Sequence, residues 1–294
     1  MQIVKAMGGL GNQMFAYSFG LALRGLGRKV ALDTSWYDRN EAHNGWELDR
    51  VFSLDIPRCT LEQRDALGDL SPRIAARLRR KLFGPHAGHY AEEGRGYDST
   101  YLDVPGDAYF DGFWQSPRYH EGVAREIEGA FRFRAELEGS DKELIEGFAG
   151  RCLIGVHARR GDYLTSDLLG GVCTTAYFRG ALRVLLEGAA NPLVLYFSDD
   201  LDWCKRELAS DTEGVFVDWN RGADSWKDMR LMGYCDRLAI SNSSFSWWGA
   251  RLRRPGARGD RTIVAPSRWY GARHKDNTDI ALPSWVRLDS RGER

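Results

Sequence analysis

Residues 152–163 read CLIGVHARRGDY, and this stretch decides the fold. Five apolar or small residues, typical of a buried strand, run directly into a polar cluster. The same order recurs at 193–200 (LVLYFSDD) and at 237–244 (RLAISNSS). Helical patterns separate these segments, which predicts a doubly wound parallel α/β domain. We expect strands at Cys152–His157, Leu193–Phe197, Val215–Val217 and Arg237–Ile240, and helices at Ala176–Glu187, Leu201–Ala209, Ser225–Tyr234 and Ser246–Leu252.

A second α/β unit opens the chain. A short apolar strand, Gln2–Ala6, leads through a glycine-rich turn into a helix that starts near Asn12, and a further strand follows at Lys29–Asp33. The buried stripe of that helix is expected to be Phe15, Phe19, Ala22 and Leu23. In the middle of the chain we expect only a strand at Ala108–Phe113 and a helix at Tyr119–Phe131. The polar stretch Gly139–Gly150 predicts a boundary between domains 1–145 and 146–294.

Composition narrows the function. The 294 residues include 41 Lys and Arg and 41 Asp and Glu, so the formal net charge is zero and nucleic acid is not the expected partner. The five cysteines are scattered and form no CxxC pair, which favours a reducing cytoplasm over a disulfide framework or zinc site. The uncharged segment Ala6–Leu23 contains glycine, Asn and Gln, so we expect neither a membrane span nor a signal peptide, and a mature chain that starts at Met1.

The first polar cluster is the segment Gly8–Gln13, GGLGNQ. A flexible turn followed by a helix N-terminus offers backbone N–H groups to an anion such as phosphate. It matches neither the Walker loop nor GxGxxG. A tight turn whose Asn12 caps the helix is the alternative interpretation.

The second cluster is His157–Tyr163, HARRGDY, at the end of a predicted strand. Two adjacent guanidinium groups stay charged and bind planar acceptors, so a diphosphate would satisfy them. The alternative is a salt bridge between Arg160 and Asp162, with His157 filling the core.

The third cluster contains Asp200-Leu201-Asp202, a DxD pattern that holds a divalent metal in some sugar transferases. The same aspartates stand where a helix begins, and capping alone favours acidic residues there. We favour capping, and take Asp199 at the strand end as the residue that contacts a ligand.

The fourth cluster runs from Asp228 to the segment Ser241–Trp248, SNSSFSWW. A hydroxyl-rich turn before a helix offers donors to an anion, and the paired Trp residues are expected in the core. Asp228 is a candidate acceptor for the N1–H and amino groups of guanine.

A basic segment at Arg73–Phe83 places Ile74, Leu78 and Leu82 on one helical face and five cations around the rest. It is either an ordinary surface helix or a contact with an anionic membrane surface. We expect a cytoplasmic protein with peripheral contact to the inner face of the membrane through 73–83.

Taken in order, the clusters resemble the α-1,2-fucosyltransferase family, glycosyltransferase family 11. The resemblance spans nearly the whole chain and rests on five strings, GGLGNQMFAYSFGLAL (8–23), VHARRGDYL (156–164), FSDDLDWC (197–204), DMRLMGYCDRLAISNSSFSWWGARL (228–252) and IVAPSRWY (263–270). It implies a GT-B fold, in which two Rossmann-like α/β domains face each other across a cleft. It further implies inverting, metal-independent transfer from GDP-L-fucose, with no cofactor.

The resemblance also implies roles for individual residues. Arg159 would bind the donor diphosphate and stabilise the charge that builds on GDP as the bond to fucose breaks. Asp162 or His157 would accept the acceptor proton, although an oxocarbenium-like transition state makes a strong base unnecessary. The expected donor contacts are Gly11, Asn12, Gln13, Arg159, Arg160, Ser198, Asp199, Asp228, Ser243, Ser244 and Phe245.

The acceptor implied by the family is O2 of a terminal β-galactose, in a free oligosaccharide or a lipid-linked glycan of a surface polysaccharide. Two alternatives remain open. One keeps the enzyme class with another GDP-hexose such as GDP-L-galactose, and the other is a non-catalytic glycan-binding or sugar-nucleotide-binding module on the same fold.

Overall fold

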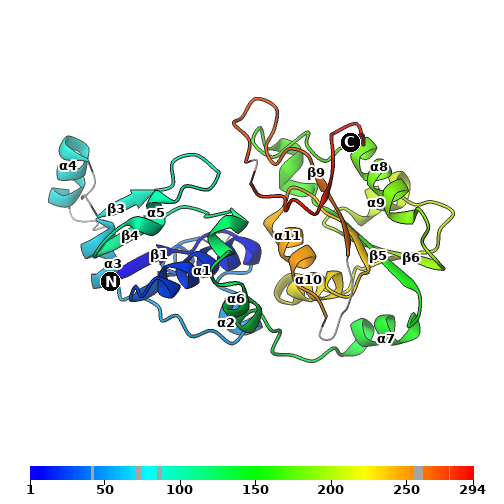
Figure 1. The fold of residues 1–294 in the computed structure, drawn as a ribbon, viewed down its shortest axis with the longest axis horizontal. Helices are drawn as coiled ribbons and strands as arrows, with labels where there is room; N and C mark the ends of the chain where they lie inside the picture. Colours follow the sequence, from blue (N-terminus) through cyan, green and yellow to red (C-terminus); the bar gives the residue numbers. More distant parts are fainter. Residues whose placement is uncertain (41–42, 70–73, 85–87, 255–260, 278) are drawn as a thin grey trace. The chain divides into compact units, whose positions relative to one another are not determined.

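In the computed structural model the chain divides into two α/β units, Met1–Arg134 and Ala135–Arg294 (Figure 1). The structure describes residues 1–40, 43–69, 74–84, 88–254, 261–277 and 279–294. The division falls ahead of the predicted boundary at 139–150. Helix α7 (Gly139–Gly147) belongs to the second unit, where Asp141 accepts hydrogen bonds from the side chains of Trp219 and Asn220.

The first unit is built on a four-stranded parallel sheet with the order β2-β1-β4-β3. Its strands are β1 (Gln2–Lys5), β2 (Val30–Asp33), β3 (His89–Ala91) and β4 (Ala108–Asp111). Its helices are α1 (Leu10–Gly25), α2 (Leu48–Val51), α3 (Leu61–Gly68), α4 (Ile74–Phe83), α5 (Thr100–Asp103), the 3₁₀ turn η1 (Pro117–His120) and α6 (Ala124–Ala130).

Helix α1 packs its predicted stripe into the core of the first unit. Phe15, Phe19 and Leu23 are fully buried, and the Phe19 ring stacks on Trp114 with ring centroids 4.3 Å apart. The helix begins at Leu10 with Gly9 as its N-cap, so Asn12 lies within the first turn and does not cap it. The capping interpretation of Asn12 is therefore wrong.

The single helix predicted over Tyr119–Phe131 is also wrong. The structure has η1 and α6 there instead, separated by three residues, Glu121–Val123. A glycine such as Gly122 destabilises the interior of a helix by about 1 kcal/mol relative to alanine. The next residue, Val123, adopts a non-helical φ of −136°. Apolar spacing alone did not reveal this break.

The second unit has a six-stranded parallel sheet with the order β10-β9-β8-β5-β6-β7. Its strands are β5 (Cys152–Ala158), β6 (Pro192–Ser198), β7 (Gly214–Phe216), β8 (Arg237–Ala239), β9 (Thr262–Pro266) and β10 (Val286–Leu288). Besides α7, its helical segments are η2 (Gly161–Thr165), α8 (Thr175–Leu186), α9 (Leu201–Glu207), η3 (Gly222–Asp224), α10 (Trp226–Met232) and α11 (Ser244–Arg251).

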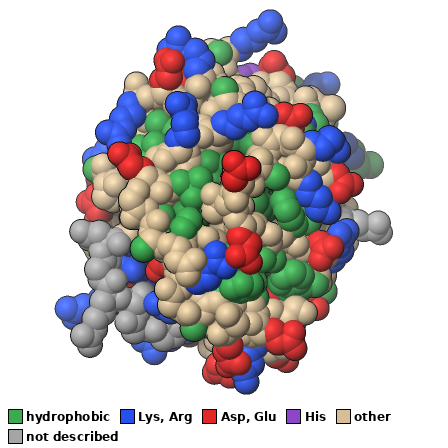
Figure 2. Space-filling view, turned by 90° about the vertical axis from the view of Figure 1, so that its right-hand side faces the viewer, with side chains coloured by type: hydrophobic (Ala, Val, Ile, Leu, Met, Phe, Trp, Pro, Cys, Tyr) green, Lys and Arg blue, Asp and Glu red, His purple; other side chains and the backbone are tan. Residues whose placement is uncertain are grey.

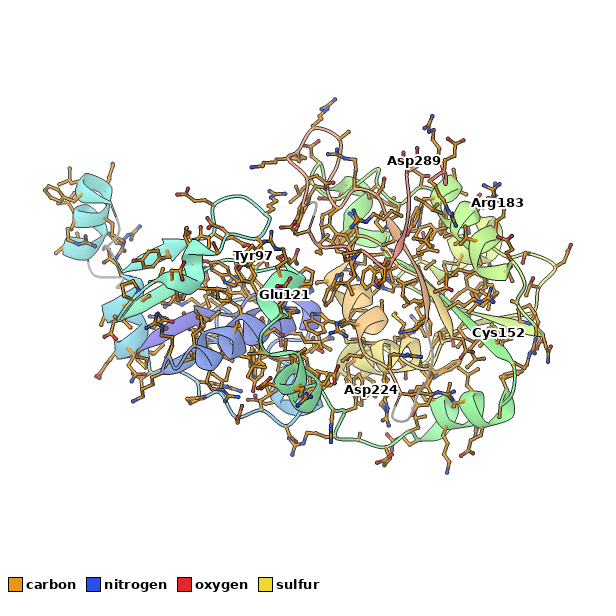
Figure 3. All side chains as sticks on the ribbon, viewed as in Figure 1. Tyr97, Glu121, Cys152, Arg183, Asp224 and Asp289 are labelled. Carbon is orange, nitrogen blue, oxygen red and sulfur yellow. The ribbon has the colours of Figure 1, made fainter. Side chains whose placement is uncertain are left out.

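The predicted elements of this unit are all present, with ends shifted by at most two residues. The central strand β5 is apolar apart from His157 because it lies inside a parallel sheet with covered faces. Cys152 marks the amino end of β5, and Asp289 follows the carboxyl end of β10 (Figure 3). Trp247 and Trp248 are fully buried, which confirms their predicted place in the core.

The surface of the second unit carries both signs of charge. Figure 2 shows Lys and Arg interspersed with Asp and Glu on one of its faces, with hydrophobic side chains between them. Among the described residues, no helix combines the length and the apolar character needed to cross a bilayer.

Candidate active site

The carboxyl edge of the second sheet gathers the polar clusters. Strand β5 pairs with β6 on one side and with β8 on the other, with Ala158 opposite Ser198 and Val156 opposite Ala239. All these strands are parallel, so the loops that start at Arg159, Asp199 and Ile240 begin at one edge. Ligands of open α/β sheets bind beyond this edge.

Arg159 is held at this edge from three sides. Its backbone N–H donates to Ser241 Oγ at 2.8 Å. Its guanidinium donates from Nε to Asp162 Oδ1 at 2.9 Å and lies 3.2 Å from Asp199 Oδ2. The side chain nevertheless keeps 35% of its surface exposed. A fixed but accessible guanidinium is suited to a planar anion from solution, such as a phosphate.

Asp199 links the loops after β5 and β6. Its Oδ1 accepts a hydrogen bond from the Arg160 backbone at 2.8 Å, while its Oδ2 approaches Arg159. A Cβ at position 161 would lie 2.7 Å from Asp199 Oδ2, so Gly161 allows this approach. Ser198 completes the link, because its hydroxyl donates to the carbonyl of Ala158 at 2.6 Å and accepts from the N–H of Asp200 at 2.9 Å.

Arg160 points toward α9 instead of the ligand-binding edge. Its guanidinium carbon lies 3.9 Å from the ring centroid of Trp203, and its Nε donates to Asp200 Oδ2 at 3.1 Å. Asp162 pairs with Arg159, so the alternative salt bridge between Arg160 and Asp162 is wrong. The stacked guanidinium of Arg160 fixes the loop on α9, and its predicted contact with a diphosphate stays a prediction.

The two aspartates of the DxD pattern have separate partners. Asp200 caps α9 by accepting a hydrogen bond from the Trp203 N–H at 3.1 Å, as the capping interpretation predicts. Asp202 is exposed and lies 3.5 Å from Lys205 Nζ. The absence of a metal requirement stays a prediction.

His157 is buried within β5, 5.7 Å between ring centroids from Phe245. Burial, together with the positive charge of Arg159, lowers the pKa of His157 to about 3. The imidazole is therefore neutral near pH 7, and such a low pKa makes it a weak proton acceptor. A proton-accepting role for His157 is therefore disfavoured by its burial and stays a prediction.

The turn after β8 connects the loops of the site by hydrogen bonds. Two of its residues, Ser241 and Asn242, were not singled out from the sequence. Ser241 Oγ donates to the His157 carbonyl at 2.7 Å while accepting from Arg159, and Asn242 Nδ2 donates to the carbonyls of Leu169 and Trp269 at 3.0 and 2.9 Å. In the sequence, only the polar string SNSS (241–244) pointed to a role for these two residues. Three of these partners, Arg159, His157 and Leu169, lie 73 or more residues away in the sequence, and Trp269 lies in the loop after β9.

Helix α11 starts in the same turn. The side chain of its N-cap residue, Ser243, forms no capping bond within the described chain and instead contacts the Tyr163 hydroxyl. The N–H groups of the first turn, at Ser244 and Phe245, thus stand at the carboxyl edge where the helix dipole favours an anion. The structure therefore brings Arg159, Asp199, Ser243, Ser244 and Phe245 to one edge, next to His157.

Asp228 lies in a separate polar cluster after β7. Asn220 Nδ2 donates to Asp228 Oδ1 at 3.0 Å and to Asp141 Oδ1 at 2.9 Å. Burial raises the pKa of Asp228 to about 8; the Asn220 hydrogen bond opposes this shift and the neighbouring charge of Asp141 adds to it. A partly exposed carboxyl with few donors is suited to a ligand that brings N–H groups to it.

The glycine loop of the first unit was predicted to contact the donor through Gly11, Asn12 and Gln13. Gly8 has a φ of +76°, and a Cβ there would lie 2.6 Å from Asn12 Nδ2. Asn12 Oδ1 accepts a hydrogen bond from Gln115 Nε2 at 2.7 Å, which orients its amide. Gly11 is buried in the first turn of α1.

Gln13 is buried, and its side chain is committed to the fold. Its Nε2 donates to the carbonyls of Gly8 and Gly45 at 3.2 and 2.8 Å, and its Oε1 accepts from the N–H groups of Glu47 and Leu48. Gln13 thus joins the glycine loop to the segment before α2, and its predicted contact with the donor stays a prediction.

A family model settles where this architecture belongs. Residues 92–289, more than half of the chain, match the model of glycosyl transferase family 11. The chain belongs to glycosyl transferase family 11. This confirms the family that the motifs indicated, and the chain is a glycosyltransferase with similarity to fucosyltransferases.

Two Escherichia coli proteins are similar to this family 11 chain over nearly its whole length. An α-1,2-colitosyltransferase is 30% identical over 98% of both chains. The O-antigen biosynthesis glycosyltransferase WbnK is 25% identical over 96% of this chain and 98% of its own. Galactoside α-(1,2)-fucosyltransferase 1 of Saimiri sciureus is 29% identical over 65% of this chain and 55% of its own.

Solved structures confirm the predicted GT-B fold of this family 11 chain. NodZ α-1,6-fucosyltransferase soaked with GDP-fucose superposes with a TM-score of 0.51 at 16% identity, covering 86% of this chain and 92% of NodZ. POFUT1 in complex with GDP-fucose superposes with a TM-score of 0.52 at 14% identity, covering 90% and 97%. At these identities the similarity establishes the fold alone.

Proposed function

We propose that this family 11 enzyme transfers L-fucose from GDP-β-L-fucose to O2 of a terminal β-galactosyl group, with inversion at C1. One observation carries the proposal. Arg159 is oriented by Asp162, Asp199 and Ser241, yet remains accessible at the sheet edge where nucleotides bind in this class of fold. A binding module that did not act on a diphosphate would have no use for a guanidinium fixed in this way.

The reaction moves electrons toward the diphosphate. The bond between C1 and the β-phosphate oxygen breaks as the acceptor O2 bonds to C1 from the opposite face, and the leaving oxygen gains the electron pair. Arg159 donates hydrogen bonds to that oxygen, and the first-turn N–H groups of α11 add positive potential. The developing charge is thereby stabilised by the protein's own donors, which supports transfer without a divalent metal.

The acceptor hydroxyl loses its proton late in this scheme. His157 has a pKa near 3 and the Asp162 carboxylate is paired with Arg159, so neither is arranged as a strong base. An oxocarbenium-like C1 reacts with a hydroxyl that is still largely protonated. In this proposal Asp162 orients Arg159, and the proton passes to solvent or to the departing diphosphate.

Asp228 supplies selectivity for the base in this proposal. Its ionised carboxylate accepts the N1–H and amino N–H groups of guanine, which adenine cannot offer in the same arrangement. Binding of two donors favours the charged carboxylate, as Asn220 already does on one side.

Release of GDP tests the proposal. Purified protein is given GDP-fucose and lactose, with and without EDTA, next to the Arg159→Ala variant. We expect GDP release and a fucosyl-α-1,2-galactose product that survive EDTA and collapse in the variant. Turnover that EDTA abolishes would identify a metal-dependent enzyme, and binding of GDP-fucose without turnover on any acceptor would favour a non-catalytic module.

A colitosyl donor is the second candidate, because a relative with 30% identity over 98% of both chains is named an α-1,2-colitosyltransferase. Colitose differs from fucose in lacking the 3-hydroxyl, and GDP-L-galactose differs from GDP-fucose at C6. Rates with these three donors on one acceptor distinguish the candidates. We place the reaction in the reducing cytoplasm, with a lipid-linked glycan of a surface polysaccharide as the proposed natural acceptor.

A further inference from the structure

Helix α4 (Ile74–Phe83) is docked by its charged side and turns its apolar side outward. Ile74, Leu78 and Leu82 are 84%, 56% and 66% exposed. Arg79 and Arg80 face the other way, where both pair with Asp69. An amphipathic helix of a globular protein normally buries its apolar stripe, so this orientation is the reverse of the usual one.

The spacing makes the exposed residues one continuous stripe. Ile74, Leu78 and Leu82 follow one another at intervals of four, so they lie along one side of the helix. Phe83, the last residue of the helix, is 80% exposed. Figure 1 shows α4 at the periphery of the first unit, on the side of the edge strand β3. An exposed apolar stripe of this extent indicates an interaction surface.

The charges beside the stripe restrict which kind of partner can bind this face of α4. Helix α4 contains Arg77, Arg79, Arg80 and Lys81 and no acidic residue. Arg77 and Lys81 are exposed and lie one turn apart next to the stripe, while the other two cations are bound to Asp69. A second copy of this chain would bring Arg77 and Lys81 against the same cations. Charge complementarity therefore favours an anionic partner.

We propose that the outward face of α4 binds an anionic lipid bilayer. The stripe enters the boundary between headgroups and acyl chains, and Arg77 and Lys81 bind lipid phosphates. A helix with an exposed apolar stripe flanked by cations on one side has the features of interfacial membrane binding. The sequence indicated a basic segment at 73–83, of which Arg73 lies outside the described residues. The structure adds that the apolar stripe faces outward. It also divides the cations, because Arg79 and Arg80 pair with Asp69 whereas Arg77 and Lys81 do not.

Vesicle sedimentation tests the proposal with the full chain. The probes are vesicles of phosphatidylglycerol with phosphatidylethanolamine, and vesicles of phosphatidylcholine alone. We expect the wild type to bind only the anionic vesicles, with affinity that falls as salt rises. Arg77→Gln with Lys81→Gln should weaken binding roughly thirtyfold. Ile74→Ser with Leu78→Ser and Leu82→Ser should weaken it at least about tenfold.

Matched variants control for general effects of charge and apolarity. Lys142→Gln with Arg183→Gln removes two exposed cations from α7 and α8 (Arg183 is labelled in Figure 3), and Leu26→Ser removes an exposed leucine after α1. Both should bind vesicles like the wild type, and every variant should keep its melting temperature and its activity on lactose. No binding by the wild type, or equal binding by the α4 variants, would overturn the proposal. So would a dimer in analytical ultracentrifugation that is lost only in the stripe variant.

Discussion

The carboxyl edge of the second sheet and the glycine loop of the first unit follow parallel strands in the same way, yet they are built from different chemistry. The edge is held by charged groups, Arg159 with Asp162 and Asp199. The loop is held by neutral amides, with Gln13 bound to four backbone groups and Asn12 bound to Gln115. Charges at one edge can stabilise a diphosphate, whereas amides and glycines fix a shape without adding charge. We therefore expect substitutions at the edge of the second sheet to lower activity by removing charge, and substitutions in the glycine loop to lower it by changing the shape of the loop.

The largest expected effect is on Arg159. Arg159→Ala should lower kcat/KM by about 10²–10³, the usual cost of removing a donor aimed at developing charge. Arg159→Lys should rescue little, because a point charge cannot reproduce the fork held by Asp162. Steady-state kinetics with GDP-fucose measure both.

Arg160→Lys is the matched control for that arginine. It keeps the cation near Trp203 and should lose less than about tenfold in kcat/KM. Equal losses at the two positions would contradict the different roles that the structure gives them.

Gln13→Ala should act on stability. It leaves the buried N–H groups of Glu47 and Leu48 without their acceptor and should lower the free energy of unfolding by about 2–3 kcal/mol. Urea denaturation measures this. Gln63→Ala, which removes an exposed glutamine of the α3 capping box, should cost no more than about 1 kcal/mol. If the Gln13 variant is as stable as the wild type but fails to bind GDP-fucose, the result would support the predicted contact of Gln13 with the donor.

The pH dependence of GDP binding tests Asp228. Its pKa of about 8 keeps it protonated in the free protein at neutral pH, so binding that needs the carboxylate should strengthen with rising pH, by up to about tenfold per unit below 8. Isothermal titration measures the dissociation constant. Asp228→Asn should bind GDP weakly and with a flat pH profile. A wild-type profile that is equally flat would contradict the proposed contact with guanine.

The same group affects stability with a definite sign. The folded pKa lies above the ordinary value of 3.8, so the native state retains a proton that the unfolded chain loses. The resulting penalty is absent below pH 3.8 and grows as the pH rises toward 8. Asp228→Asn should therefore be more stable than the wild type at pH 8, as measured by its melting temperature.

The smallest expected effect is at Gln115. Gln115→Ala removes the hydrogen bond that orients the Asn12 amide and should lower kcat about fivefold, equivalent to about 1 kcal/mol, with little change in melting temperature. An effect confined to KM would indicate that Asn12 contributes to binding alone.

In the second unit, strands β5 to β8 were predictable because the strands that lead into the site are apolar runs that end in conspicuous polar strings, whereas helix α7 and strands β9 and β10 were not predicted. Cys152–Ala158 and Pro192–Ser198 are buried except at residues on their ends, so their sequence carries a clear apolar pattern. The middle of the first unit was not predictable. Strand β3 has three residues that are not fully buried, and the break between η1 and α6 depends on Gly122 in a segment that otherwise has helical spacing.

The sequence by itself determined the family, the parallel α/β class and the residues at the strand ends, because these depend on residue type and order along the chain. The tertiary structure decided which groups meet. It paired Asp162 with Arg159, placed Arg160 on Trp203 and buried Gln13 among backbone groups. It also turned the apolar stripe of α4 outward. Adjacent residues such as Arg159 and Arg160 share one chemistry, but the direction of each side chain depends on partners from distant strands and helices.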